Sequence, residues 1–189
     1  DTVFGIVSVH NIPIYDAIHR GGGITAVAVR HEQGAVHAAD GYARVTGKLG
    51  VAITSTGPGV TNGVTGLFEA GFASSRVMMI AGQIDSAYYG KGKGFLHEAE
   101  NQLPLLRTVT GRTESVRRPE EIGEAVFRVA QDINTGRPRP GAVEIPIDFQ
   151  YAKAEIDIPH VEAWPRKAPD RDAIARAVEA IRNAKKVVI

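Results

Sequence analysis

The sequence predicts an α/β fold: a doubly wound, mainly parallel six-stranded sheet with helices on both faces. Short apolar runs rich in β-branched residues alternate along the chain with longer runs of helical periodicity. Turn residues separate the two kinds of segment. Because parallel strands need a crossover connection, usually a helix, this alternation favours a parallel sheet over an antiparallel one.

Strands are expected where the apolar runs are short. They lie at Thr2–Gly5, Ile24–Val29, Val51–Ser55, Val77–Ala81 and Ala142–Ile145, with a weaker one at Thr113–Val116. Helices are expected between them, at Asn11–Arg20, Gln33–Thr46, Thr61–Ala73 and Pro119–Asn134. Residues 82–112 break the alternation, and their glycine-rich part, Tyr88–Gly94, is typical of a flexible functional loop.

Three segments are expected along the chain. Residues 1–150 form the α/β domain, and residues 151–169, which carry three prolines, form a linker. Residues 170–189 contain a helix at Asp170–Asn183 followed by the beginning of a strand. We therefore expect a second, truncated domain to begin at residue 170, in a longer protein.

The composition excludes several classes of protein. The chain is 43% hydrophobic and 23% charged, as in ordinary globular proteins, and its net charge of +1 gives no basis for binding nucleic acid or an anionic membrane. It has no cysteine, so disulfides and thiolate metal sites are excluded. No apolar run approaches ~18 residues and no signal pattern begins the chain, so a cytoplasmic protein is expected.

Glu32 is the first candidate site residue. It lies between an expected strand and an expected helix, within the run Val29-Arg30-His31-Glu32-Gln33-Gly34-Ala35. The helix dipole alone favours an acid there by ~0.3–1 kcal/mol, but that does not explain the small residues around it. An acid at the carboxyl end of a strand lies where α/β folds bind ligands, and an apolar pocket would raise its pKa and suit it to proton exchange.

The segment from Gly57 to Gly63 is the second candidate, because it follows a strand and precedes a helix. A nucleotide-binding α/β module is one interpretation. However, Asn62 occupies the third glycine position of the dinucleotide fingerprint, and Pro58 removes a backbone N–H that would face a phosphate. The alternative is a tight turn that presents its backbone and Asn62 to a neutral ring.

Other motifs fail on spacing. Ala35 stands where a zincin would need its second histidine, and the six histidines have no ligand spacing, so no metal site is expected in this chain. His97, Glu98 and Glu100 could suggest a metal site, but they are better explained as solvated loop residues. His10, after the first strand, is either a polar cap or an active-site donor.

Five motifs together resemble the N-terminal pyrimidine-binding domain of thiamine-diphosphate enzymes of the acetolactate synthase (acetohydroxyacid synthase) group. They occur in the family's order and spacing over roughly residues 1–150. They are Arg30-His31-Glu32-Gln33, Gly41-Tyr42-Ala43-Arg44, Gly57-Pro58-Gly59 with Asn62, Ala81-Gly82-Gln83, and Gly136-Arg137-Pro138.

The resemblance implies a carboligase or decarboxylase acting on a 2-keto acid, in which Glu32 is catalytic. The family's matching glutamate bonds N1′ of the cofactor's aminopyrimidine and favours the imino tautomer that activates the thiazolium carbon. The resemblance further implies that Gly57, Pro58, Gly59 and Asn62 line the ring. By the same resemblance, Gln83, His10 and His97 are substrate-side residues.

The resemblance also implies the cofactors and partners. Thiamine diphosphate is expected, with Mg²⁺ held by a motif that this chain lacks, and FAD is optional, with Arg137 as its contact. A homodimer or homotetramer with active sites between subunits is expected. The segments Gly5–Ser8 and Phe95–Glu98 depart from the family pattern on the substrate side, which leaves the acceptor open. A noncatalytic regulatory domain is a third interpretation, against which the intact Glu32 argues.

Overall fold

The chain forms an all-parallel six-stranded sheet. A computed structural model describes residues 1–160, 164 and 168–188. The strand order is β2-β1-β3-β4-β6-β5, and every neighbouring pair is parallel. The strands are β1 (Thr2–Gly5), β2 (Thr25–Ala28), β3 (Gly50–Thr54), β4 (Val77–Gln83), β5 (Arg112–Ser115) and β6 (Gly141–Pro146). This confirms the predicted fold class.

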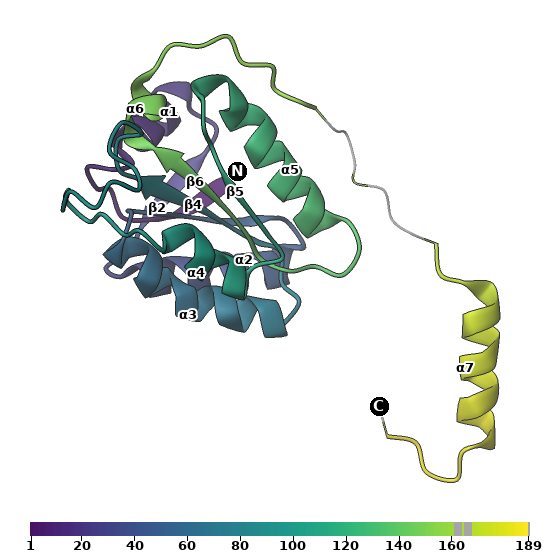
Figure 1. Ribbon diagram of the computed structural model, residues 1–189. Helices are drawn as coiled ribbons and strands as arrows, with labels where there is room; N and C mark the ends of the chain where they lie inside the picture. The colour runs from purple at the N-terminus through teal and green to yellow at the C-terminus, as the bar shows by residue number, and fades with distance from the viewer. Residues whose placement is uncertain (161–163, 165–167, 189) are drawn as a thin grey trace.

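Helices cover both faces of the sheet (Figure 1). One face carries α2 (Glu32–Thr46), α3 (Pro58–Phe72) and α4 (Gln102–Val109). The other carries α1 (Ile12–Gly21), α5 (Ile122–Asn134) with its leading 3₁₀ turn at Pro119–Glu121, and α6 (Ile147–Tyr151). The last helix, α7 (Arg171–Asn183), has no buried residue.

A separate apolar core lies under each layer of helices. The core beneath α2 and α3 is made largely of small residues, among them Ala35, Val36, Ala39, Ala52 and Ala81. Larger side chains fill the core beneath α5, including Met78, Val129, Ile133, Val143 and Ile145. Central strands that contribute to both cores read as continuous apolar runs, as in β4, where six of the seven residues are buried.

The expected elements were located to within a few residues, and two helices were missed. Residues 82–112 were expected to contain no helix, yet α4 lies within them, and α6 was not expected at all. The prediction of a final strand is wrong for residues 184–188, because these described residues form no strand. Residue 189 lies outside the described part of the chain.

The chain after α6 runs along α5. Residues 152–160 form neither helix nor strand, and Ile156 and Asp157 lie against Gly123 of α5. The Trp164 ring packs on Phe127, with the ring centres 5.6 Å apart. The expected linker at 151–169 falls partly on residues 161–163 and 165–167, which lie outside the described residues. Among the described residues, no helix has the length and apolarity needed to cross a bilayer.

Candidate functional site

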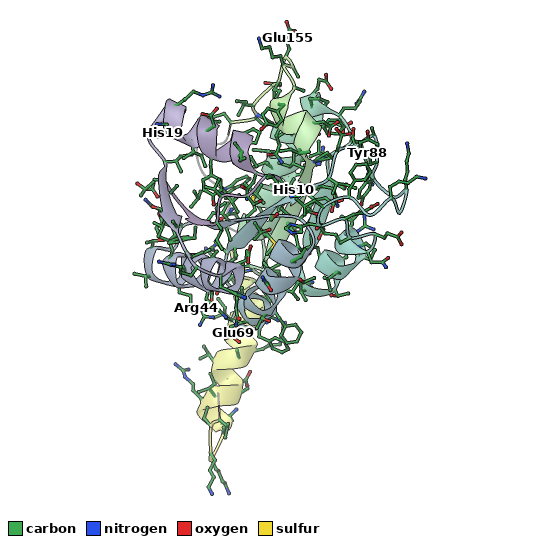
Figure 2. All side chains as sticks on the ribbon, turned by 90° about the vertical axis from the view of Figure 1, so that its left-hand side faces the viewer. His10, His19, Arg44, Glu69, Tyr88 and Glu155 are labelled. Atoms are coloured by element: carbon green, nitrogen blue, oxygen red, sulfur yellow. The ribbon has the colours of Figure 1, made fainter. Side chains whose placement is uncertain are left out.

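The strand order places a topological switch point between β1 and β3. The chain leaves β1 towards β2 on one side, while β3 pairs with β1 on the other. In open α/β sheets, ligands bind at such a point, outside the carboxyl ends of the strands. The two loops that emerge there are in contact, because His10 Nδ1 lies 3.3 Å from Ser55 Oγ. Figure 2 labels His10 near the middle of the domain.

Glu32 is the first residue of α2 and follows β2 at the same edge. The helix begins there because the preceding His31 caps it, with Nδ1 accepting the Gln33 N–H at 3.2 Å. The partly buried Glu32 carboxylate accepts a hydrogen bond from Asn62 Nδ2 of α3 through Oε2, at 3.0 Å. No hydrogen bond from the described residues reaches its other oxygen, Oε1.

The turn before α3 brings backbone close to this carboxylate. Gly57 caps the helix with φ +54°, a conformation that favours glycine, and a Cβ there would collide with the His97 carbonyl. At Gly59 a Cβ would stand 3.3 Å from Glu32 Oε1 and 2.8 Å from Ser55 Cβ. Glycine at 59 therefore keeps the space beside the free carboxylate oxygen open.

The same turn is poorly suited to cradling a phosphate. The Gly57 N–H donates to Gln102 Oε1 at 2.8 Å, and the Gly59 N–H donates to the Thr56 carbonyl at 3.1 Å. Pro58 has no N–H to offer. Because the amides of a phosphate loop must point at the ligand, this geometry argues against the nucleotide-binding interpretation.

The structure brings His10 and His97 together. Their ring centres are 5.7 Å apart, and His97 comes from the loop after β4 with φ +61°. His10 is buried whereas His97 is exposed. Burial, and to a lesser extent repulsion from His97, lowers the pKa of His10 below its usual 6.5. Both rings thus lie near the switch point, and their substrate-side role stays a prediction.

Gln83 lies deeper, at the end of β4, and only 1% of its surface is exposed. Its Oε1 accepts the Ile84 N–H and shares the single hydrogen of the Thr56 hydroxyl with Gln102 Oε1, and its Nε2 donates to Glu144 Oε2 at 3.3 Å. Its polar atoms are therefore engaged inside the protein. The substrate-side role of Gln83 stays a prediction.

Arg137 lies near the amino ends of the strands, at the opposite end of the sheet from Glu32. It precedes β6, and its Nε donates to Ser74, which precedes β4, at 2.9 Å. It lines a groove of about 530 Å³ together with Phe68, Phe72 and Arg139. Arg137 is therefore not part of the Glu32 site within this chain, and its contact with FAD stays a prediction.

The structure reveals polar residues that the sequence did not single out. Gln102 and Glu144 are buried, at 2% and 0% exposure, and Glu144 accepts hydrogen bonds from both Gln102 and Gln83. Glu144 lies within an otherwise apolar buried strand, and a charged residue in such a strand is the sequence signal that could have identified it. No comparable signal marked Gln102, because its segment was interpreted as a loop.

Glu98 organises the glycine-rich loop. Its carboxylate accepts the N–H groups of Gly92, Gly94 and Phe95 at 2.7–3.1 Å. The loop that carries His97 is thus held by local hydrogen bonds, and Glu98 is not simply a solvated residue. Within the described part of the chain, no group of three or more acidic or histidine side chains could hold a metal ion.

Comparisons with known proteins identify the family of the chain. Residues 1–105 match the family model described as thiamine pyrophosphate enzyme, N-terminal TPP binding domain. The chain is 38% identical over 191 residues to a probable 2-ketoarginine decarboxylase of Pseudomonas aeruginosa, covering 100% of this chain and 34% of the relative. It is also 38% identical over 195 residues to the acetolactate synthase large subunit of Corynebacterium glutamicum, covering 100% of this chain and 30% of the relative.

A third relative, the acetolactate synthase isozyme 3 large subunit of Escherichia coli, is 33% identical over 197 residues, covering 99% of this chain and 33% of the relative. The chain thus spans about a third of the length of these relatives. The family model, by contrast, matches more than half of the chain, and its match contains Glu32 and the turn from Gly57 to Asn62. The chain belongs to the thiamine pyrophosphate enzymes and contains their N-terminal cofactor-binding domain.

Proposed function

We propose that this chain supplies the pyrimidine-binding half of the active site in an enzyme that cleaves a 2-keto acid, as a decarboxylase or a carboligase. The relatives named above are a probable 2-ketoarginine decarboxylase and acetolactate synthases, which supports a 2-keto acid as the substrate. Thiamine diphosphate, when bound, supplies a carbon nucleophile that attacks the keto carbon and holds the electron pair left by carbon dioxide.

One observation carries the proposal: the Glu32 carboxylate has one oxygen anchored and the other available. Asn62 holds Oε2, while Oε1 faces the space that Gly59 leaves open. A carboxylate in this position can exchange a proton with a ring nitrogen of an aminopyrimidine laid against the glycine. The residues present therefore fit the cofactor's pyrimidine, and Glu32 is the proposed catalytic residue.

The turn from Gly57 to Asn62 gives the ring its second wall. Gly57 and Gly59 have no side chain, so the backbone of the turn can lie close to the ring. Pro58 stiffens the turn, and Asn62 orients the Glu32 carboxylate through its hydrogen bond. His10 and His97 are proposed to hold or move a proton on the substrate side, where their rings already lie side by side. The neutral form of His10 is favoured by its burial and suits it to accept that proton.

The remaining requirements are proposed to be met outside this chain. The described residues contain no cluster for a divalent cation, so the Mg²⁺ that would hold the diphosphate would take its ligands from another domain. A second copy of the protein would then close the pocket over Glu32, giving a homodimer or a homotetramer. FAD, if used, would contact Arg137 away from Glu32. We propose the cytoplasm as the site of action.

The test of Glu32 is an isosteric substitution in the complete protein. Glu32→Gln keeps the size of the side chain but removes its ability to take up a proton, so 2-keto acid turnover should fall by ~100-fold or more. The melting temperature should stay within about 2 °C, because Glu32 is only partly buried.

Glu120→Gln is the matched control. Glu120 is an exposed acid in the first turn of a helical segment, and its replacement should leave turnover unchanged. Near-normal turnover by Glu32→Gln would refute the proposed role of Glu32. If the wild-type protein failed to bind thiamine diphosphate, the function as a whole would be refuted.

A further inference from the structure

We propose that Gln102 is a positioning residue for the turn at Gly57, and that the buried carboxylate of Glu144 fixes the orientation of Gln102. The inference rests on the proposed function, because the positioned turn is the one that faces the cofactor's pyrimidine. It goes beyond that function by giving a role to a polar cluster that touches neither Glu32 nor the proposed substrate-side histidines.

The side-chain amide of Gln102 makes four hydrogen bonds. Its Oε1 accepts the Gly57 N–H and the Thr56 hydroxyl, both at 2.8 Å. Its Nε2 donates to the Gly82 carbonyl and to Glu144 Oε2, both at 3.1 Å. This one amide joins the turn after β3 to β4 and β6, and all of its hydrogen-bonding capacity for two acceptor and two donor bonds is used.

Glu144 determines which way this amide points. Its Oε2 accepts from Gln83 and Gln102, and its Oε1 accepts from the Tyr89 hydroxyl at 3.0 Å and the Ser115 hydroxyl at 2.7 Å. Oε2 acts as an acceptor towards two N–H donors, so the NH₂ end of Gln102 must face it. The carbonyl end must then face Gly57.

The turn depends on this contact because, among the described residues, the Gly57 N–H has no other acceptor. Gly57 has a φ of +54°, a conformation that favours glycine, and the next residue, Pro58, contributes no N–H. A buried amide that loses its acceptor is costly, so releasing the Gly57 N–H would let the turn relax. Since Gly59 lies two residues on, against Glu32 Oε1, relaxation of the turn would reach the carboxylate that the cofactor needs.

Two variants of the complete protein test the inference. Gln102→Met keeps the volume of the side chain and removes all four bonds. Glu144→Gln keeps the shape but replaces one of the two acceptor oxygens by an NH₂ group, which weakens the hold on the Gln102 amide. We expect the dissociation constant for thiamine diphosphate to rise by ~10-fold or more in the first and to rise less in the second.

The direct readout is amide hydrogen exchange of the peptide that spans residues 56–61, measured without cofactor. Exchange at Gly57 should accelerate by ~10-fold or more in Gln102→Met, which loses the acceptor, and by a smaller factor in Glu144→Gln, which holds the acceptor less firmly. Gln131→Met, the same substitution at an exposed site of α5, is the matched control and should change neither measurement. If Gln102→Met does not fold, the exchange rate at Gly57 in Glu144→Gln decides whether the inference holds.

Two results would overturn the inference. One is unchanged exchange at Gly57 with unchanged cofactor affinity. The other is a lower melting temperature alone, which would make the cluster merely a source of stability. The proposed function is tested separately, because exchange at Gly57 needs no ligand, whereas Glu32→Gln and wild-type cofactor binding report on the site itself.

Discussion

Three buried or partly buried carboxylates of this domain are held by hydrogen bonds from uncharged donors. Glu32 accepts from Asn62, Glu98 accepts three backbone N–H groups, and Glu144 accepts four side-chain donors. None of the three carboxylates forms an ion pair with another described residue. Asp40, by contrast, forms an ion pair with Arg44, in which Arg44 Nη2 lies 2.7 Å from Asp40 Oδ2. Anchoring Glu32 through an amide leaves its second oxygen available, which a bidentate arginine would not.

His10 gives stability a pH dependence at the residue scale. Burial is the main cause of its lowered pKa, and the neighbouring His97 is the second. The unfolded chain takes up a proton near pH 6.5, whereas the folded protein resists protonation until a lower pH. The His10 contribution to stability is therefore fully present above pH 6.5 and is lost as the pH falls from there towards the folded pKa.

We predict that the free energy of unfolding falls between pH 6.5 and 5 and that His10→Asn makes this fall shallower. His19→Asn, at an exposed position at the end of α1, is the control and should keep the wild-type slope. Urea denaturation at several pH values measures the effect. Parallel slopes for wild type and His10→Asn would contradict the assignment.

At the element scale, the pair α2 and α3 places Asn62 within reach of Glu32. The two helices can approach this closely because glycine on α3 meets valine on α2. A Cβ on Gly66 would lie 2.7 Å from both Cβ and Cγ1 of Val36, a fully buried residue. The spacing of the two helices, and hence the Glu32–Asn62 hydrogen bond, depends on the absence of a side chain at Gly66.

Gly66→Ala should therefore destabilise the fold, by ~1–3 kcal/mol as in other overpacked cores. The control, Gly41→Ala on the exposed side of α2, adds a Cβ that meets nothing within 4 Å. It should stabilise the helix by up to ~1 kcal/mol, because alanine has the higher helix propensity. Chemical denaturation of both variants gives the comparison, and equal stabilities would refute the packing argument.

Elements were predictable where their periodicity is long, and the misses have physical reasons. The 15 residues of α2 have a clear helical pattern and were located from sequence. The eight residues of α4 contain Pro104, which usually ends a helix but is tolerated here because it lies in the first turn, where no N–H is needed. α6 has only five residues, too few for any period to show.

At the scale of the whole molecule, the local parts of the site were predictable and the long-range parts were not. Glu32 and the turn from Gly57 to Asn62 each lie within one short segment, next to an element boundary that the sequence marks. Gln102 and Glu144 are 42 residues apart and meet only because β6 pairs with β4. Alternation of strands and helices predicted a parallel sheet, but it does not fix the order of the strands, so this cluster could not be predicted.

The last prediction concerns the chain of 189 residues on its own. It contains Glu32 and the glycine turn, but its described residues offer no metal cluster, and the amides of Gly57 and Gly59 are bonded internally. The diphosphate of the cofactor thus finds little to bind. We expect calorimetry to show weak binding of thiamine and thiamine diphosphate, with affinities within about threefold of each other, since only the pyrimidine is recognised.

The same reasoning predicts that EDTA changes neither affinity and that the purified chain releases no carbon dioxide from pyruvate. The complete protein is the positive control, in which the diphosphate and a divalent cation should raise affinity well above that for thiamine. Tight, Mg²⁺-dependent binding of thiamine diphosphate by the 189 residues, or measurable turnover of pyruvate, would show that the chain holds the diphosphate site as well. Weak, metal-independent binding that Glu32→Gln abolishes would place the whole of the recognition in the pyrimidine pocket.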